Sequence, residues 1–132
     1  MTKSIAVTAL LCPLFLVGCS SAADMAASSK VCNDFMADLK AHKFNQAYAR
    51  LAPVCKSSVP QPKMEEMWAA IEKANGKPSQ WTKQGFQAKT GTWGKTINYG
   101  YSVTCPKRAI KASFSCVPGL TSWQIQGFSF NW

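Results

Sequence analysis

Acidic side chains are missing from the second half of the chain. Fifteen of its 132 residues are Lys or Arg and six are Asp or Glu, a net charge of +9, yet no carboxylate follows Glu72. A carboxylate general acid or base is therefore excluded from that half. Asp34 and Asp38 are one helical turn apart, and we expect them on a solvated helix face. The single histidine, His42, has no recognisable nucleophile partner, and no glycine-rich phosphate loop occurs. We predict no catalytic residue, no cofactor and a protein that is not an enzyme.

Closely spaced cysteine pairs are also missing. The chain has six cysteines, but no two of them form a C-x-x-C motif. Four-cysteine zinc sites and thioredoxin-like redox sites are built on such pairs. The sequence therefore predicts no metal site.

No apolar run is long enough to span a bilayer, which takes about 20 residues. The run at residues 5–15 follows Lys3 and closes with Leu-Val-Gly-Cys at residues 16–19. A positive start, a short apolar core and a small residue at the cut are typical of a signal peptide. The closing tetrapeptide resembles the lipobox of bacterial lipoproteins. An ordinary secretory signal, cut after residues 21–23, is the alternative.

The lipobox resemblance implies cleavage before Cys19 and a diacylglycerol on its thiol, so residues 1–18 are expected to be a lipoprotein signal peptide. Ser20, rather than aspartate, implies sorting to the bacterial outer membrane, with the protein facing the periplasm. Residues 19–28 are small and polar, and we expect a lipid-anchored flexible tether. Residues 29–132 suffice for a single domain. The membrane is then a partner through the lipid, and we expect no nucleic-acid partner.

Four cysteines remain once the signal peptide and the lipidated residue are set aside. An even number in an exported chain predicts two disulfides. Spacing favours a bond between Cys32 and Cys55 across a helical hairpin, which leaves Cys105 and Cys116. A bond from Cys105 to a helix cysteine stays open, because four cysteines permit three connectivities.

Helical periodicity dominates the first part of this domain. Apolar spacing predicts helices over residues 29–41 and 46–51. A third helix is predicted from Pro62, which suits a first helical position, to Gly76, a natural stop. Residues 56–61 are expected to be a linker.

From Trp81 onward the pattern alternates, which predicts strands. Turns are expected at Gly94-Lys95, at residues 106–109 and at residues 118–121, with a bulge at Gly127 that keeps one face apolar. The predicted fold class is α+β, with three N-terminal helices packed on a curved four-stranded antiparallel sheet.

This order of elements resembles the nuclear-transport-factor-like, cystatin-like superfamily, a cone of helices on a bent sheet. Residues 35–48, 68–76 and 123–128 carry the likeness, which covers nearly all of the domain. Some relatives are isomerases or dehydratases with an acid–base residue in the cone, so a small enzyme of that kind is one alternative. Tyr99 or Tyr101 would then be the base, although we expect both to pack in the core.

Basic side chains in the sheet half are the remaining functional signal. Lys89 and Lys111 are expected to point away from the core, and Lys107 and Arg108 to occupy a turn. From these four we predict an envelope-anchored binding or accessory module for an anionic envelope component or a protein partner. The other alternative is a periplasmic inhibitor or immunity protein against a toxin or cell-wall hydrolase. The sequence leaves the oligomeric state open.

Overall fold

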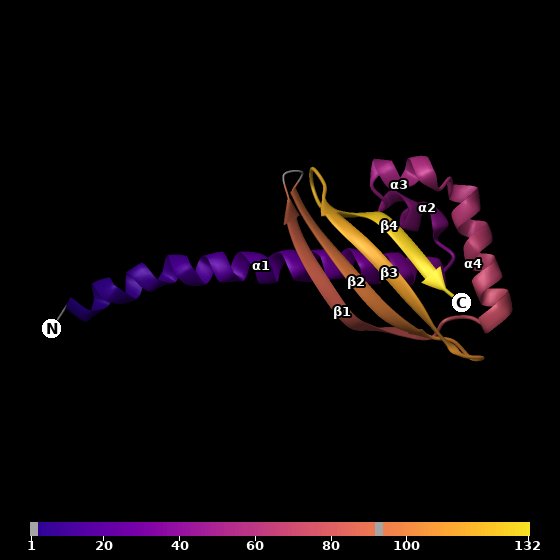
Figure 1. Cartoon of the computed structure of the whole chain (residues 1–132), viewed down its shortest axis with the longest axis horizontal. Helices are drawn as coiled ribbons and strands as arrows, with labels where there is room; N and C mark the ends of the chain where they lie inside the picture. Colours follow the sequence, from indigo (N-terminus) through magenta and orange to yellow (C-terminus); the bar gives the residue numbers. More distant parts are fainter. Residues whose placement is uncertain (1–2, 92–93) are drawn as a thin grey trace.

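Four helices precede four strands in the computed structural model, which describes residues 3–91 and 94–132, with side chains from residue 22 onward. The strands form one antiparallel sheet in chain order, so the predicted α+β class and meander are confirmed. Figure 1 shows α1 crossing one face of the sheet while α2, α3 and α4 gather beside β4. The elements are α1 (Lys3–Lys40), α2 (Phe44–Ala49), α3 (Pro53–Ser58), α4 (Gln61–Asn75), β1 (Gln80–Gly91), β2 (Gly94–Thr104), β3 (Ala109–Pro118) and β4 (Trp123–Asn131).

Helix α1 extends far beyond the predicted first helix. Residues 19–28, where the sequence predicts a flexible tether, belong to this helix. Asp24 forms an ion pair with Lys95 of β2 at 2.7 Å, and the buried Ser28 Oγ lies 2.7 Å from the Tyr99 hydroxyl. Alanine-rich sequence favours helix, and these contacts hold it on the sheet. Among the described residues, no helix is both long and apolar enough to cross a membrane.

A fourth helix, α3, occupies part of the segment expected to be a linker. Helix α2 has already ended at Ala49, and Pro53, which has no N–H to lose and a φ suited to the first helical turn, begins a new helix. Ala52 before it is extended, and its N–H donates to the carbonyl of Ile125 at 2.7 Å. The number of helices predicted from the sequence is therefore one too small, whereas Gly76 ends α4 as predicted.

The strand order is as predicted, but the pairing register differs. Phe86 pairs with Tyr99 rather than Val103, because the first hairpin turns between Gly91 and Gly94. The two residues of that turn, 92–93, lie outside the described residues. A shift by an even number of residues keeps the same side chains on the inner face, so the predicted apolar face survives the error.

Irregular pairing occurs at two places in the sheet. The β3–β4 register changes between Ser115 and Cys116, where their partners are Gly127 and Ile125, so the bulge predicted at this point is confirmed. A second shift, which the sequence analysis missed, lies in β1 just before Gly85. Both shifts bring the strand pattern back to one inner face.

The core fills the space between the helices and this inner face. Phe35 of α1, Trp68 of α4 and Phe114 of β3 are each at most 2% exposed. The Phe35 and Phe114 rings meet edge to face with centroids 5.9 Å apart, and the Trp68 ring meets that of Phe130 in the same way at 5.7 Å. Because the large side chains all take this side, the opposite face of the sheet is left to small and polar residues.

Candidate functional site

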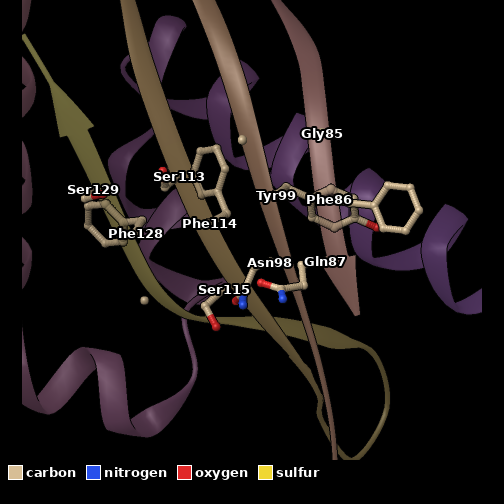
Figure 2. Close-up of a pocket in the computed structure, with 12 residues that line it drawn as sticks. Gly85, Phe86, Gln87, Asn98, Tyr99, Ser113, Phe114, Ser115, Phe128 and Ser129 are labelled. Atoms are coloured by element: carbon tan, nitrogen blue, oxygen red, sulfur yellow. The ribbon is translucent and has the colours of Figure 1, made fainter. Parts of the chain in front are cut away.

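A shallow groove of about 470 Å³ lies on the face of the sheet opposite the helices. Two rows of paired residues cross all four strands and form its floor. Figure 2 shows Gln87, Asn98 and Ser115 side by side, from β1, β2 and β3. We call this feature the polar groove; its rows are Gly85, Gly100, Ser113 and Ser129, then Gln87, Asn98, Ser115 and Gly127.

Strand alternation creates the polar groove. Successive side chains point to opposite faces, so residues on either side of a core residue both point outward. The inward-pointing residues Phe86, Tyr99, Phe114 and Phe128 lie between the two rows, one on each strand, although Phe86 on the edge strand is 54% exposed. Glycine and serine hardly rise above the sheet, which leaves the backbone within reach of a bound molecule.

The side chains of the polar groove offer hydrogen bonds and no charge. Gln87 and Asn98 contribute amides, and Ser113 and Ser129 contribute hydroxyls. A further hydroxyl, that of Ser115, accepts a hydrogen bond from Gln126 Nε2 at 2.9 Å. Such a surface suits a molecule rich in hydroxyl, carbonyl or amide groups.

Two of the four predicted binding residues flank the polar groove. Lys89 lies two residues beyond Gln87 on β1 and is paired with Thr96; Lys111 lies two residues before Ser113 on β3 and is paired with Ser102. Both lysines are exposed on the outer face. Along β2 their partners are six residues apart, which places the two lysines about 20 Å from each other, at opposite ends of the groove.

The other two predicted binding residues, Lys107 and Arg108, lie in the β2–β3 turn beside Lys111. Asn75, the last residue of α4, holds this turn: its carbonyl accepts the Lys107 N–H at 3.0 Å and its Oδ1 accepts Arg108 Nε at 2.9 Å. Asn75 is 1% exposed, and its Nδ2 donates to the carbonyl of Ile71 at 3.1 Å. The sequence analysis missed Asn75, because an asparagine before a glycine suggests only a helix end.

More positive charge gathers at this end of the molecule. Lys40 Nζ donates to the carbonyl of Ser79, whose N–H donates to that of Thr104. The nearby carboxylate of Glu72 is 2.9 Å from His42 Nε2. We call this surface the basic end; its five basic residues are Lys40, Lys77, Lys107, Arg108 and Lys111. None of these five side chains forms an ion pair with the residues that the structure describes.

The two tyrosines considered as bases pack in the core, as expected. The Tyr99 hydroxyl lies 2.7 Å from Ser28 Oγ and donates to the carbonyl of Met25 at 2.9 Å. Burial raises the pKa of Tyr99, and it raises that of Tyr101 to about 12. At neutral pH both hydroxyls therefore stay protonated, which is unfavourable for a general base.

The cysteines are arranged differently from the favoured pairing. Cys32 of α1 lies against Cys116 of β3, with the two sulfurs 3.2 Å apart and not bonded, so the structure does not join Cys32 to Cys55. Cys55 and Cys105 are both buried. The side chain of Cys19, the predicted lipidation site, lies outside the described residues.

A second groove of about 340 Å³ lies between α1, α2 and the start of β4. Arg50 lines it, with Nε 2.8 Å from Asp38 and a terminal nitrogen 3.6 Å from Asp34. Asp38 is 8% exposed, so its expected place on a solvated face is wrong. Asp34 is also paired with Lys30 at 2.6 Å, so the two carboxylates balance the two basic side chains beside this groove.

Within the described residues, no group of three or more His, Cys, Asp or Glu side chains is placed to hold a metal ion. Comparison with known proteins finds no family model that matches the chain and no curated protein that is significantly similar to it.

Proposed function

We propose that the protein is a binding module of the bacterial cell envelope, anchored by a lipid on Cys19, which holds an anionic, hydroxyl-bearing envelope polymer against the outer face of its sheet. The observation that carries the proposal is the placement of the basic residues. Lys89 and Lys111 lie at the two ends of the polar groove, and Lys107 and Arg108 continue the positive surface at one end.

The charge distribution supports an anionic partner. No carboxylate side chain follows Glu72, so no residue of the sheet opposes the positive groups. Lysines about 20 Å apart suit a polymer with repeated negative groups better than a small anion, since one small anion reaches only one of them. The positive field also speeds encounter with such a partner.

The chemistry of the polar groove supports binding rather than turnover. Its floor offers amides, hydroxyls and backbone, while the only titratable side chain among its lining residues is Tyr99, whose hydroxyl is bonded on the helix side of the sheet. Sugar hydroxyls and acyl amides are partners for such groups. Polymers that combine these groups with charge include peptidoglycan, through its carboxylates, and lipopolysaccharide, through its phosphates.

The test reverses charge at both ends of the polar groove. We expect the double variant Lys89→Glu/Lys111→Glu of the full chain to bind at least about tenfold more weakly, because two attractive ion contacts become repulsive. Binding is measured by co-sedimentation with purified peptidoglycan and with lipopolysaccharide vesicles, over a range of salt concentrations. Wild-type binding should weaken as salt rises.

The matched control makes the same change of charge elsewhere. Lys43 and Lys63 are exposed and lie on the helical side of the molecule. Lys43→Glu/Lys63→Glu should therefore bind within about twofold of wild type. Equal loss in both double variants, or no loss in either, would refute the proposal. Binding to an acidic protein but to neither polymer would favour the inhibitor or immunity alternative.

A further inference from the structure

We propose that Cys32 and Cys116 form a disulfide bond that fastens α1 to the sheet, and that Cys55 and Cys105 remain thiols. This inference is independent of the proposed function. It replaces the two bonds expected from the sequence with a single bond between a helix and a strand.

The contact between Cys32 and Cys116 carries the proposal. Both residues are completely buried, and their sulfurs are 3.2 Å apart, although they are 84 residues apart in sequence. A disulfide is about 2.05 Å long, so the sulfurs must approach by roughly 1 Å, which small side-chain rotations can supply. The same interface holds Ser28, whose carbonyl is 3.9 Å from Cys116 Sγ. The backbones on both sides are thus already in place.

The other two cysteines are placed too far apart to pair. Cys55 lies three residues beyond Ala52, whose N–H donates a hydrogen bond to the carbonyl of Ile125. Ile125 and Ile97 are both partners of Cys116, at one end of the sheet. Cys105 lies eight residues beyond Ile97 in the extended direction, about 25 Å away. Disulfides join residues whose Cα atoms are within about 7 Å, so Cys55 and Cys105 are left unpaired.

The bond forms by exchange with a small disulfide such as oxidised glutathione. One cysteine thiolate attacks it, which releases one thiol and leaves a mixed disulfide on the protein. The second thiolate then attacks that mixed disulfide and releases a second thiol. The protein gives up two electrons and two protons overall, and the oxidant is reduced to two thiols.

The timing of the reaction follows from burial. In the folded, reduced protein the hydrogen bond with Cys116 and burial both raise the pKa of the Cys32 thiol, so hardly any reactive thiolate is present. The oxidant also has no path to sulfurs that are completely buried. The bond is therefore made while the chain folds, before α1 is packed on the sheet.

The test maps the bond in the full chain. The reduced, unfolded protein is refolded with oxidised and reduced glutathione, free thiols are alkylated, and tryptic peptides are identified by mass spectrometry. Trypsin separates Cys32, Cys55, Cys105 and Cys116 from one another and from Cys12 and Cys19, because Lys or Arg residues lie between them. We expect peptide 31–40 joined to peptide 112–132. Peptides 51–56 and 96–107 should carry the alkylating group.

Two variants sharpen the result. Cys55→Ser should keep the joined pair, whereas Cys116→Ser should yield peptide 31–40 in alkylated form. As a second measurement, oxidised glutathione added after the reduced protein has folded should give the joined pair at least about tenfold more slowly than oxidised glutathione present during refolding. Recovery of peptides 31–40 and 112–132 as separate alkylated species from the wild type, or either one joined to 51–56 or 96–107, would overturn the proposal.

Discussion

Gly100 sits at the centre of the polar groove and lets a ligand approach the backbone of β2. A Cβ atom added at Gly100 would meet nothing within 4 Å, so the space above it is open. Its φ is not in the left-handed region, so a side chain is tolerated there. The position is therefore one where binding and stability can be changed separately.

We predict that Gly100→Val weakens binding to the envelope polymer by at least about fivefold and leaves stability unchanged or raised by up to about 1 kcal/mol. Valine suits a strand better than glycine, but its methyl groups would fill the groove. Co-sedimentation and urea unfolding measure the two effects. Gly76→Val is the contrasting variant: it should lower stability, because Gly76 has φ +86° and its Cβ would lie 2.9 Å from the ring of Pro106. A Gly100→Val protein that binds as wild type would place the ligand elsewhere.

Single residues also show where sequence reasoning fails. Asn75 fixes the turn that presents Lys107 and Arg108, yet no local pattern distinguishes it from an ordinary helix-end residue. Asp38 is spaced from Asp34 like a member of a solvated face, but Arg50 of the next helix covers it. In both cases a partner distant in sequence decides the role, and periodicity carries no information about it.

At the scale of elements, the ion pair between Asp38 and Arg50 links α1 to the end of α2. Asp38 has an 11% exposed side chain and accepts from Arg50 Nε at 2.8 Å. We predict that Asp38→Asn lowers the free energy of unfolding by about 1.5 to 3 kcal/mol, the usual loss for a hydrogen bond to a charged group. Asp34→Asn is the control, with an expected loss below about 1 kcal/mol, because its partner Lys30 is 75% exposed and its other contact, with a terminal nitrogen of Arg50, is 3.6 Å long. Urea unfolding tests both; equal losses would contradict the prediction.

The sequence predicted the order and type of the long elements because their periodicity is strong. It missed α3 because Pro53 was taken only as a helix end, although proline is equally suited to a beginning. It predicted a tether where α1 continues, because small polar residues are compatible with both coil and helix. The contact of Ser28 with Tyr99, which is distant in sequence, favours the helix. The predicted pairing registers differ from the observed ones by an even number of residues. Such a shift leaves every side chain on the same face, so the alternating pattern cannot detect it.

The groove could be anticipated only in part. Lys89 and Lys111 were placed on the outer face by alternation alone, and the structure agrees. The alignment of two small-residue rows across four strands depends on the exact registers and on two bulges. Sequence patterns fix neither, so the polar groove itself emerged only from the structure.

At the scale of the whole molecule, a Cys32–Cys116 bond closes most of the domain into one loop. Because the cysteines are 84 residues apart, the loss of chain entropy in the unfolded state should stabilise the oxidised protein by about 4 to 5 kcal/mol. We predict that reduction lowers the free energy of unfolding by this order, measured by urea unfolding with and without reductant. The free energy of unfolding of the Cys116→Ser variant should not change with reductant. A wild-type protein with the same free energy of unfolding in both conditions would refute the prediction.

A continuous α1 also changes what an anchor at Cys19 would mean mechanically. From position 19 to the first sheet contact at Asp24 there are five residues of helix, a rise of about 8 Å. A flexible tether would let the domain tumble and search its surroundings. A helical stalk would instead hold the domain at a set, short distance from Cys19. The outer face of the sheet would then sample only the layer next to the membrane.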